Sequence, residues 1–253
     1  MPNIIAFVNQ KGGVGKTTSC LNVGAALSRK GQRVLLIDAD PQGNLTIGAG
    51  VDLGDNDPTI YEVLKGKADI NDAIQFTEYS SYDLIPADII LSGADVELSG
   101  IPGREMILKE KLAQITAIYD YILIDCPPSL SLITIMALTA ATGVIIPVQA
   151  HFYALNGVVQ LIDTINLVKR RMNPQLEITG VITTMYDPRK LINKEVYDSL
   201  NNAFPGKVYK STISNSVALV EAPSAGKDIF KYKPGCKAAK QYEALADEIM
   251  KGL

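Results

Sequence analysis

Residues 9–18 read Asn-Gln-Lys-Gly-Gly-Val-Gly-Lys-Thr-Thr, and this glycine-rich stretch decides the fold of the chain. It follows an apolar run at 4–8 and precedes a helical pattern from Lys16 to about Lys30. Glycines allow consecutive backbone N–H groups to turn toward one anion, and a helix N-terminus adds partial positive charge. The strand, loop and helix therefore predict a cradle for phosphate groups.

The loop departs from the general P-loop pattern at its start. That pattern has Gly, four residues, and then Gly-Lys-Ser/Thr. Gly15, Lys16 and Thr17 match its end, whereas Gln10 stands where the first Gly is expected. A second lysine, Lys11, lies just before two glycines and indicates more phosphate charge than one lysine normally meets. The alternative is a glycine loop on a Rossmann-like domain that binds another phosphate.

Two further strands are expected to end in carboxylates. The string Leu-Leu-Ile-Asp-Ala-Asp-Pro-Gln-Gly-Asn places Asp38 near a strand end and Asp40 in the following loop. The string Tyr-Ile-Leu-Ile-Asp ends in Asp125, as a Walker-B strand does. Either pattern alone is also typical of a turn or a helix cap. Beside a phosphate loop they predict a Mg²⁺ site, with Thr17 binding the metal directly and Asp125 holding it through water.

Five apolar runs are nearly unbroken rather than alternating, and helical patterns lie between them. Runs of this length, rich in Ile and Val, suit central strands of a parallel sheet buried on both faces. The expected strands are 4–8, 34–37, 121–124, 144–148 and 178–183, and the expected helices are 16–30, 105–118, 130–140, 153–172, 194–204 and 236–251. This order predicts a doubly wound, mainly parallel α/β sheet with helices on both faces. We expect one domain over residues 1–253, with 43–60 as its most mobile loop.

Composition and cysteine spacing exclude several classes of protein. The chain is 47% hydrophobic and 20% charged, as ordinary globular proteins are. No stretch of about 18 apolar residues occurs, and the first strand begins at once, so we expect no signal peptide, no membrane span and a cytoplasmic location. Cys20, Cys126 and Cys236 are widely spaced without a CxxC motif, which favours reduced thiols over disulfides or cluster ligands.

The two lysines of the loop resemble those of the signature-lysine P-loop ATPases, the group that contains the ParA/Soj partition ATPases, MinD and the nitrogenase iron protein. The resemblance implies ATP and Mg²⁺ as cofactors and an ATPase activity. It implies that Lys16 reaches the β- and γ-phosphates of its own nucleotide. Lys11 would reach the partner subunit's nucleotide, so that ATP holds a homodimer together. The phosphate-binding residues implied are Lys11, Gly12, Gly13, Val14, Gly15, Lys16, Thr17 and Thr18.

The resemblance also assigns roles around the phosphates and the base. Asp40 matches the carboxylate that orients the attacking water, and Asp38 supports the magnesium shell through water. The implied catalytic residues are thus Lys11, Lys16 and Asp40. No Glu follows Asp125, so hydrolysis is expected to be slow until a partner or a dimer completes the site. The residues expected to flank the adenine are Met185, Ile213, Ser214 and Asn215.

Strings across the whole chain look like the Soj branch of ParA, among them Pro147-Val148-Gln149 and Glu221-Ala222-Pro223-Ser224. This branch implies non-specific DNA binding by the ATP dimer, a ParB-like activator protein and association with the nucleoid. Arg189 stands where the branch carries a DNA-contacting arginine. Asn215 and Ala218, however, stand where arginines are usual, and His151 and Asn156 stand where acidic residues are common.

The distribution of charge suggests how DNA binding is retained. Residues 1–150 carry 10 Lys and Arg against 17 Asp and Glu, whereas residues 151–253 carry 14 against 10. Phosphate contacts depend on charge more than on residue identity. The candidate DNA-binding residues are Arg189, Lys207, Lys227, Lys231, Lys233, Lys237 and Lys240. The other interpretation of these lysines is an ordinary solvated face.

Three functions remain open at the level of sequence. The first is a partition ATPase that segregates chromosome or plasmid DNA. The second is a ParA-like ATPase that positions another cargo, such as a mobile element, a chemoreceptor array or a microcompartment. The third is a MinD-like membrane ATPase, which needs a basic amphipathic tail, whereas the last 13 residues include Glu243, Asp247 and Glu248.

Overall fold

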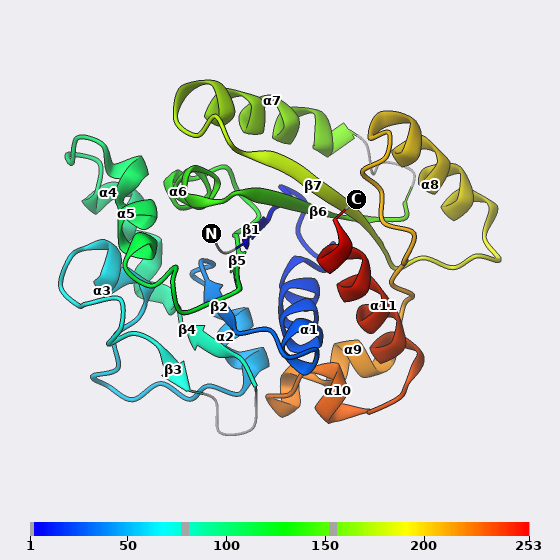
Figure 1. Ribbon diagram of the computed structural model, residues 1–253, viewed down its shortest axis with the longest axis horizontal. Coiled ribbons are helices and arrows are strands. Elements are labelled where there is room, and N and C mark those ends of the chain that lie inside the picture. Colours follow the sequence, from blue (N-terminus) through cyan, green and yellow to red (C-terminus); the bar gives the residue numbers. More distant parts are fainter. Residues whose placement is uncertain (1–2, 77–80, 152–155, 253) are drawn as a thin grey trace.

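The computed structural model describes residues 3–76, 81–151 and 156–252, and in this part of the chain seven strands form one sheet. The strand order is β3-β4-β2-β5-β1-β6-β7 (Figure 1). The strands are β1 (Asn3–Phe7), β2 (Val34–Asp38), β3 (Gln75–Phe76), β4 (Asp83–Ile85), β5 (Tyr121–Asp125), β6 (Gly143–Gln149) and β7 (Glu177–Thr184). Neighbouring strands are parallel, except that β3 runs antiparallel to β4. The predicted doubly wound, mainly parallel α/β fold is confirmed.

Helices cover both faces of the sheet (Figure 1). They are α1 (Lys16–Arg29), α2 (Asn44–Ala49), α3 (Ile60–Leu64), α4 (Ala94–Glu97), α5 (Ile107–Ala113), α6 (Leu132–Ala140), α7 (Asn156–Arg171), α8 (Leu191–Ala203), α9 (Val217–Glu221), α10 (Ile229–Tyr232) and α11 (Lys237–Lys251). Short 3-10 helices lie at η1 (Ile89–Gly93), η2 (Arg104–Met106) and η3 (Pro223–Ala225). None of the helices in the described segments is long and apolar enough to cross a bilayer.

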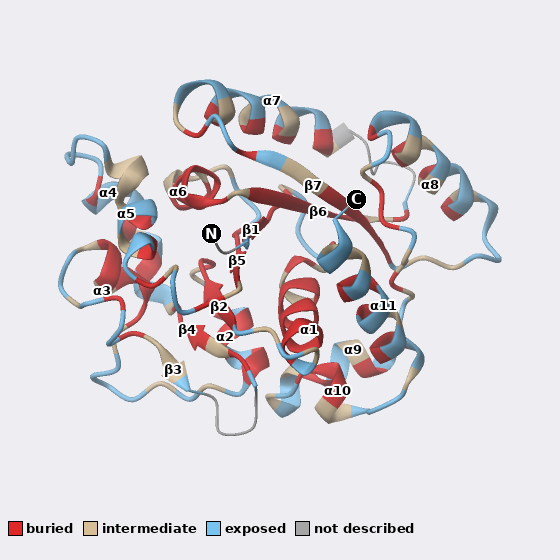
Figure 2. Ribbon diagram, viewed as in Figure 1, coloured by how far each residue is buried: buried red, intermediate tan, exposed pale blue. Residues whose placement is uncertain are grey.

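The unbroken apolar strands are buried on both sides, as the sequence pattern predicts (Figure 2). Successive side chains of a strand point to opposite faces. In β5, Ile122 and Ile124 join one core with α3, α5, α6 and α7, whereas Leu123 joins the other core with α1, α2, α10 and α11. The sheet therefore carries two hydrophobic cores, and the buried carboxylates of its central strands, Asp38 and Asp125, lie at the carboxyl ends.

Sequence patterns locate the central elements more closely than the short ones. All five predicted strands agree with the structure to within one residue at each end. The expectation of a loop at 43–60 is wrong for residues 44–49, which form α2, and for Ile60, which begins α3. Six residues are too few for helical periodicity to be recognised, and contacts from elsewhere stabilise this helix. The helix expected at 105–118 is a 3-10 turn followed by the shorter α5, and residues 153–155 of the helix expected at 153–172 lie outside the described residues.

The three cysteines are free thiols, as predicted. Cys20 and Cys126 are buried in opposite cores, where they act as small apolar side chains. Cys236 is partly exposed, and its sulfur accepts a hydrogen bond from the Ala239 N–H at 3.4 Å at the start of α11. The Cys126 thiol lies behind the strand end that carries Asp125, which agrees with a role in packing.

Candidate nucleotide site

The register of the sheet brings the predicted acidic residues to the same edge as the glycine-rich loop. β5 pairs with β1 on one side and with β2 on the other, so Asp125 lies opposite Phe7 and also opposite Asp38. The loop after β1 therefore begins beside both carboxylates. Ala39 extends the pairing by donating its N–H to the Asp125 carbonyl at 2.9 Å. This edge, at the carboxyl ends of central parallel strands, is where open α/β sheets bind ligands.

Two glycines shape the loop between β1 and α1. Gly13 and Gly15 have φ values of 71° and 85°, a left-handed conformation that glycine adopts without steric cost. Gly15 is the N-cap of α1, so the unpaired N–H groups of the first helical turn open toward the loop. The Thr184 hydroxyl donates to the Val14 carbonyl at 2.8 Å and fastens the loop to the end of β7. The loop thus has the geometry of a phosphate cradle.

The two lysines of the loop differ in exposure. Lys16 is only 7% exposed, and its ammonium group lies 3.5 Å from the Lys11 carbonyl oxygen. Burial lowers the pKa of Lys16, and the nearby Asp125 opposes this shift. Lys11 is exposed, and its ammonium group lies 3.4 Å from the side-chain oxygen of Gln149. Among the described residues no carboxylate forms an ion pair with Lys11.

Thr17 and Asp125 form a pair that fits a magnesium ion. The Thr17 hydroxyl donates to Asp125 Oδ2 at 2.6 Å, while Oδ1 is buried without a hydrogen-bond partner in the described structure. A buried carboxylate oxygen without a donor is costly unless a cation accompanies it. Over the described ranges, no cluster of three or more His, Cys, Asp or Glu side chains is arranged to hold a metal. This donor set suits Mg²⁺, which is commonly held by one or two carboxylates together with phosphate oxygens and water.

Burial raises the pKa of both carboxylates at the strand ends. The pKa of Asp125 lies well above its ordinary value because the group is buried, with Asp38 adding repulsion and the Thr17 hydrogen bond opposing the rise. Burial also raises the pKa of Asp38 to about 6, although hydrogen bonds from Thr46 and Asp40 lower it. A divalent cation at this edge would favour the ionised forms of both groups.

Asp38 connects the end of β2 to helix α2. Its Oδ2 accepts hydrogen bonds from the Thr46 N–H and the Thr46 hydroxyl, both at 2.8 Å, and its Oδ1 accepts from the Asp40 N–H at 3.1 Å. The Thr46 hydroxyl in turn accepts from the Ala87 N–H at 3.1 Å, just beyond β4. Asp40 Oδ1 accepts from the Gln42 N–H at 3.0 Å. Asp38, before the Asp40 loop, and Thr46, after it, are therefore bonded to each other, and this fixes both ends of the loop.

A cavity of about 520 Å³ lies between the glycine-rich loop and α2, within the size range of ligand sites. It brings the predicted phosphate residues together with Asp40 and with residues from two regions that the sequence motifs do not mark. Its lining is Gly12, Gly13, Gly15, Lys16, Thr17, Thr18, Leu21, Asp40, Gln42, Asn44, Ile47, Gly48, Pro128, Pro223 and Ser224. Pro223 and Ser224 close this cavity from the C-terminal part of the chain.

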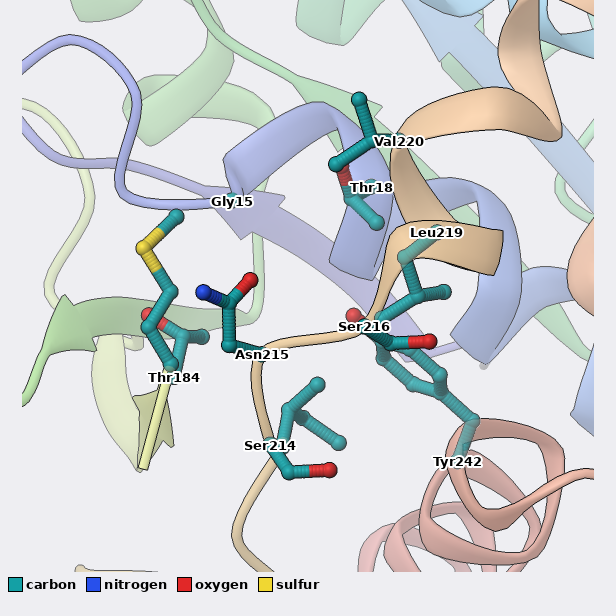
Figure 3. Close-up of a pocket in the computed structure, with 11 residues that line it drawn as sticks. Gly15, Thr18, Thr184, Ser214, Asn215, Ser216, Leu219, Val220 and Tyr242 are labelled. Carbon is teal, nitrogen blue, oxygen red and sulfur yellow. The ribbon is translucent and has the colours of Figure 1, made fainter. Parts of the chain in front are cut away.

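A second pocket adjoins the first at Gly15 and Thr18 (Figure 3). It gathers all four residues expected to flank the adenine, and its full lining is Gly15, Thr18, Thr184, Met185, Ile213, Ser214, Asn215, Ser216, Leu219, Val220 and Tyr242. Met185 has a φ of 52°, and it is the one non-glycine residue with positive φ among those described. Such a conformation persists where the surroundings enforce it, and it is concentrated at ligand sites. Here the flanking Thr184 and Tyr186 are both hydrogen-bonded to neighbouring segments.

The structure does not gather the predicted DNA-binding residues into one place. Arg189 follows the carboxyl end of β7, whereas Lys207 lies beyond the far end of α8, a helix about 20 Å long. The other candidates fall between residues 227 and 240, around α10 and the start of α11. The single basic face expected from the sequence is therefore distributed over three separate regions in the structure.

Two of these basic residues are paired with carboxylates. The Arg189 guanidinium forms two hydrogen bonds with Asp187, at 3.0 and 2.9 Å, and its side chain is 88% exposed. Lys231 is partly buried, with its ammonium group 3.8 Å from Asp228 and 5.8 Å from the centre of the Tyr82 ring. Lys231 thus contributes to packing between α10 and the sheet, and Arg189 carries a charge that Asp187 partly offsets.

A glycine loop between a strand and a helix, with Lys16 inside it and the Thr17–Asp125 pair beside it, defines a P-loop ATPase. The sequence profile of the family described as AAA domain matches residues 2–178. The sporulation initiation inhibitor protein Soj of Bacillus subtilis is 48% identical over 98% of this chain and 98% of its own length. The chromosome partitioning protein ParA of Caulobacter vibrioides is 45% identical over 98% of this chain and 93% of its own.

A solved structure agrees with these relatives. Cobyrinic acid a,c-diamide synthase from Mycobacterium smegmatis, with bound ADP and magnesium, matches with a TM-score of 0.87 and 36% identity, over 99% of this chain and 95% of that chain. The chain therefore belongs to the ParA/Soj family of partition ATPases. The predicted cofactors, ATP and Mg²⁺, are of the kind with which this structural relative was solved.

Sequence reasoning missed several residues that build the site. Thr46 bridges Asp38 and Ala87. Tyr242 lines the second pocket, the one expected to hold the base, and its hydroxyl lies 3.3 Å from Ser19 Oγ. Gln241 accepts two hydrogen bonds from Ser214, which lines the same pocket. These residues act through partners that are far away in the sequence or in unmarked short helices, so no local motif reveals them. The string Glu221–Ser224, which resembles the Soj branch, is the sequence signal for Pro223 and Ser224.

We expect Thr46→Val to lower the free energy of unfolding by about 1–3 kcal/mol, because Asp38 loses a donor and the buried Ala87 N–H loses its acceptor. Urea unfolding followed by far-UV circular dichroism measures this change. Thr164→Val is the matched control, since the Thr164 hydroxyl bonds only within α7, to the Gln160 carbonyl. Equal, small losses in the two variants would show that the Thr46 bridge contributes little.

Proposed function

We propose that this protein is an ATP-dependent dimerising ATPase that acts in DNA segregation. Its ATP dimer binds DNA without sequence preference, and a ParB-like partner stimulates hydrolysis. In this proposal the protein is cytoplasmic and associates with the nucleoid in its ATP-bound state. The observation that carries the proposal is the contrast between the buried Lys16 and the exposed Lys11 in one loop. Names of similar proteins support the role in chromosome partitioning.

The dimer follows from the position of Lys11. Its ammonium group lies at the mouth of the loop beside the neutral Gln149, and no carboxylate of the described chain offsets its charge. A lysine so placed adds little to a pocket that Lys16 already serves. It can neutralise a phosphate that a second copy of the chain presents at this edge. ATP, which carries more negative charge than ADP, would then join two chains.

Hydrolysis depends on residues that hold the phosphates and the attacking water in place. Lys16 and the N–H groups of the loop bind the phosphate oxygens, and Thr17 with Asp125 holds Mg²⁺. Bound Mg²⁺ neutralises charge that develops on the phosphate oxygens. Asp40 lines the same cavity, with Oδ1 occupied by the Gln42 N–H, so its second oxygen is the group that orients the water. Among the described residues that line this cavity, Asp40 is the one carboxylate, and this supports slow hydrolysis before a partner acts.

The C-terminal helix argues against the MinD-like alternative. The apolar side of α11 is already buried in the protein core, with Tyr242, Leu245 and Ala246 each at most 1% exposed. Its outer side carries Asp247, which pairs with Lys30 at 2.7 Å. An amphipathic helix that binds a membrane needs a free apolar side and a basic polar side. Helix α11 has no free apolar side, and its polar residues mix lysines with acidic side chains, which favours DNA over a lipid surface.

Lys11→Ala should abolish ATP-dependent dimerisation while leaving nucleotide binding by the single chain largely intact. Lys11 is exposed and lies outside the ring of residues that lines the phosphate cavity. Light scattering of an Asp40→Ala protein with ATP and Mg²⁺, with and without the Lys11 substitution, measures the effect, and ADP serves as the control nucleotide. If the Asp40→Ala protein stays monomeric with ATP, the proposed dimer is wrong.

Asp40→Ala should retain ATP binding and the dimer but lose turnover, since it removes water positioning and leaves the phosphate cradle in place. Lys16→Ala should instead lose nucleotide affinity, because the buried ammonium group is part of the cradle. Titration with a fluorescent ATP analogue and a phosphate-release assay separate the two effects. Equal losses of ATP affinity in both variants would show that Asp40 only stabilises its loop.

DNA binding should require ATP, tolerate any duplex sequence and weaken steeply with salt. Each neutralised phosphate contributes about 0.9 to the slope of log affinity against log salt concentration. Arg189→Ala should lower affinity for all sequences alike and flatten this slope. Arg33→Ala is the matched control, because Arg33 is also exposed and forms the same two-bond pair with an aspartate, Asp120. Arg33 precedes β2 and so lies at the amino ends of the strands, away from the nucleotide site.

Filter binding of the Asp40→Ala dimer at several salt concentrations measures these affinities. A dimer that forms with ATP but retains no DNA even at low salt would contradict the DNA-binding role. The positioning of another cargo through a protein surface would then be the better interpretation.

A further inference from the structure

Helix α11 holds the segment that lines the base pocket. Gln241 Oε1 accepts two hydrogen bonds from Ser214, one from its N–H at 3.1 Å and one from its hydroxyl at 2.9 Å. Two turns later, the Glu248 carboxylate accepts from the N–H groups of Lys210 and Ser211, both at 2.8 Å. The last helix thus takes up four donors of residues 210–214. Only the pair at Ser214 borders the base pocket.

Several backbone N–H and C=O groups of residues 210–214 already form hydrogen bonds within the protein. The Ile213 N–H donates to the Thr183 carbonyl at 2.9 Å, and the Ile213 carbonyl accepts from the Tyr186 N–H at 3.0 Å. Because Gln241 takes both donors of Ser214, the polar capacity left on Ser214 is that of acceptors, its carbonyl and hydroxyl oxygens. In Figure 3 the Ser214 hydroxyl points away from Gly15, on the opposite side of the pocket.

We propose that Gln241 is a positioning residue that sets base specificity, by keeping both donors of Ser214 turned away from the base. This inference rests on the proposed use of the pocket for adenine. The 6-amino group of adenine is a donor and matches a carbonyl acceptor. The 6-oxo group of guanine is an acceptor, and it meets an acceptor where it needs a donor. Gln241 itself touches no nucleotide and acts only through Ser214.

The test compares ATP with GTP rather than measuring ATP alone. Gln241→Leu keeps the bulk of the side chain but releases the Ser214 N–H and hydroxyl, which can then donate to a 6-oxo group. We expect the preference for ATP over GTP to fall about tenfold, the effect of one misplaced hydrogen bond of about 1.4 kcal/mol. Gln241→Glu retains an acceptor oxygen and should retain the preference. Competition of unlabelled ATP and GTP against a fluorescent ATP analogue, with the full-length protein, gives the ratio.

Glu248→Leu is the matched control, because it also removes an acceptor of two backbone N–H groups from α11 but lies away from the pocket. It should leave the ATP-to-GTP ratio unchanged. If Gln241→Leu weakens both nucleotides equally, or if Glu248→Leu changes the ratio as much, Gln241 is merely structural. A wild-type protein that binds ATP and GTP equally well would overturn this inference but not nucleotide binding. A protein that binds neither would instead overturn the proposed function.

Discussion

The position of β5 between β1 and β2 is the constraint on which the rest of the site depends. Its in-register pairing with both neighbours makes three strands end at the same level, so Asp125 lies opposite Asp38 on one side and the start of the glycine loop on the other. A slip of one residue in a parallel strand would turn every side chain to the opposite face. The two hydrophobic cores resist such a slip. They thereby fix the distances between the two carboxylates and the glycine loop.

The buried carboxylates show how the structure compensates for this concentration of charge. Asp38 uses its oxygens to hold α2 and the Asp40 loop, and Asp125 keeps one oxygen for Thr17 and one without a donor. One carboxylate therefore organises the protein itself, while the other keeps an oxygen without a donor, as the proposed Mg²⁺ site requires. The two residues look alike in the sequence, since each ends an apolar strand, and only their hydrogen bonds distinguish them.

The sequence predicts the central strands, the loop and the Thr17–Asp125 pair, because their signals are local: an apolar run, a glycine spacing and a polar residue at a strand end. It misses α2 because six residues show no periodicity, and it misses Thr46 and Gln241 because their partners lie elsewhere in the chain. The charge of a side chain is also visible in the sequence, whereas its pairing is not. Arg189 looks like a free cation until Asp187 is seen beside it.

The base pocket joins the two ends of the chain, since Gly15 and Thr18 come from its beginning and Tyr242 from its last helix. During synthesis the phosphate loop leaves the ribosome more than 200 residues before α11 does. The growing chain can therefore form its first strands and glycine loop without any pocket for a base. This pocket can therefore form only after α11 has been synthesised. Chains that stop short of α11 would have the glycine loop without the complete second pocket.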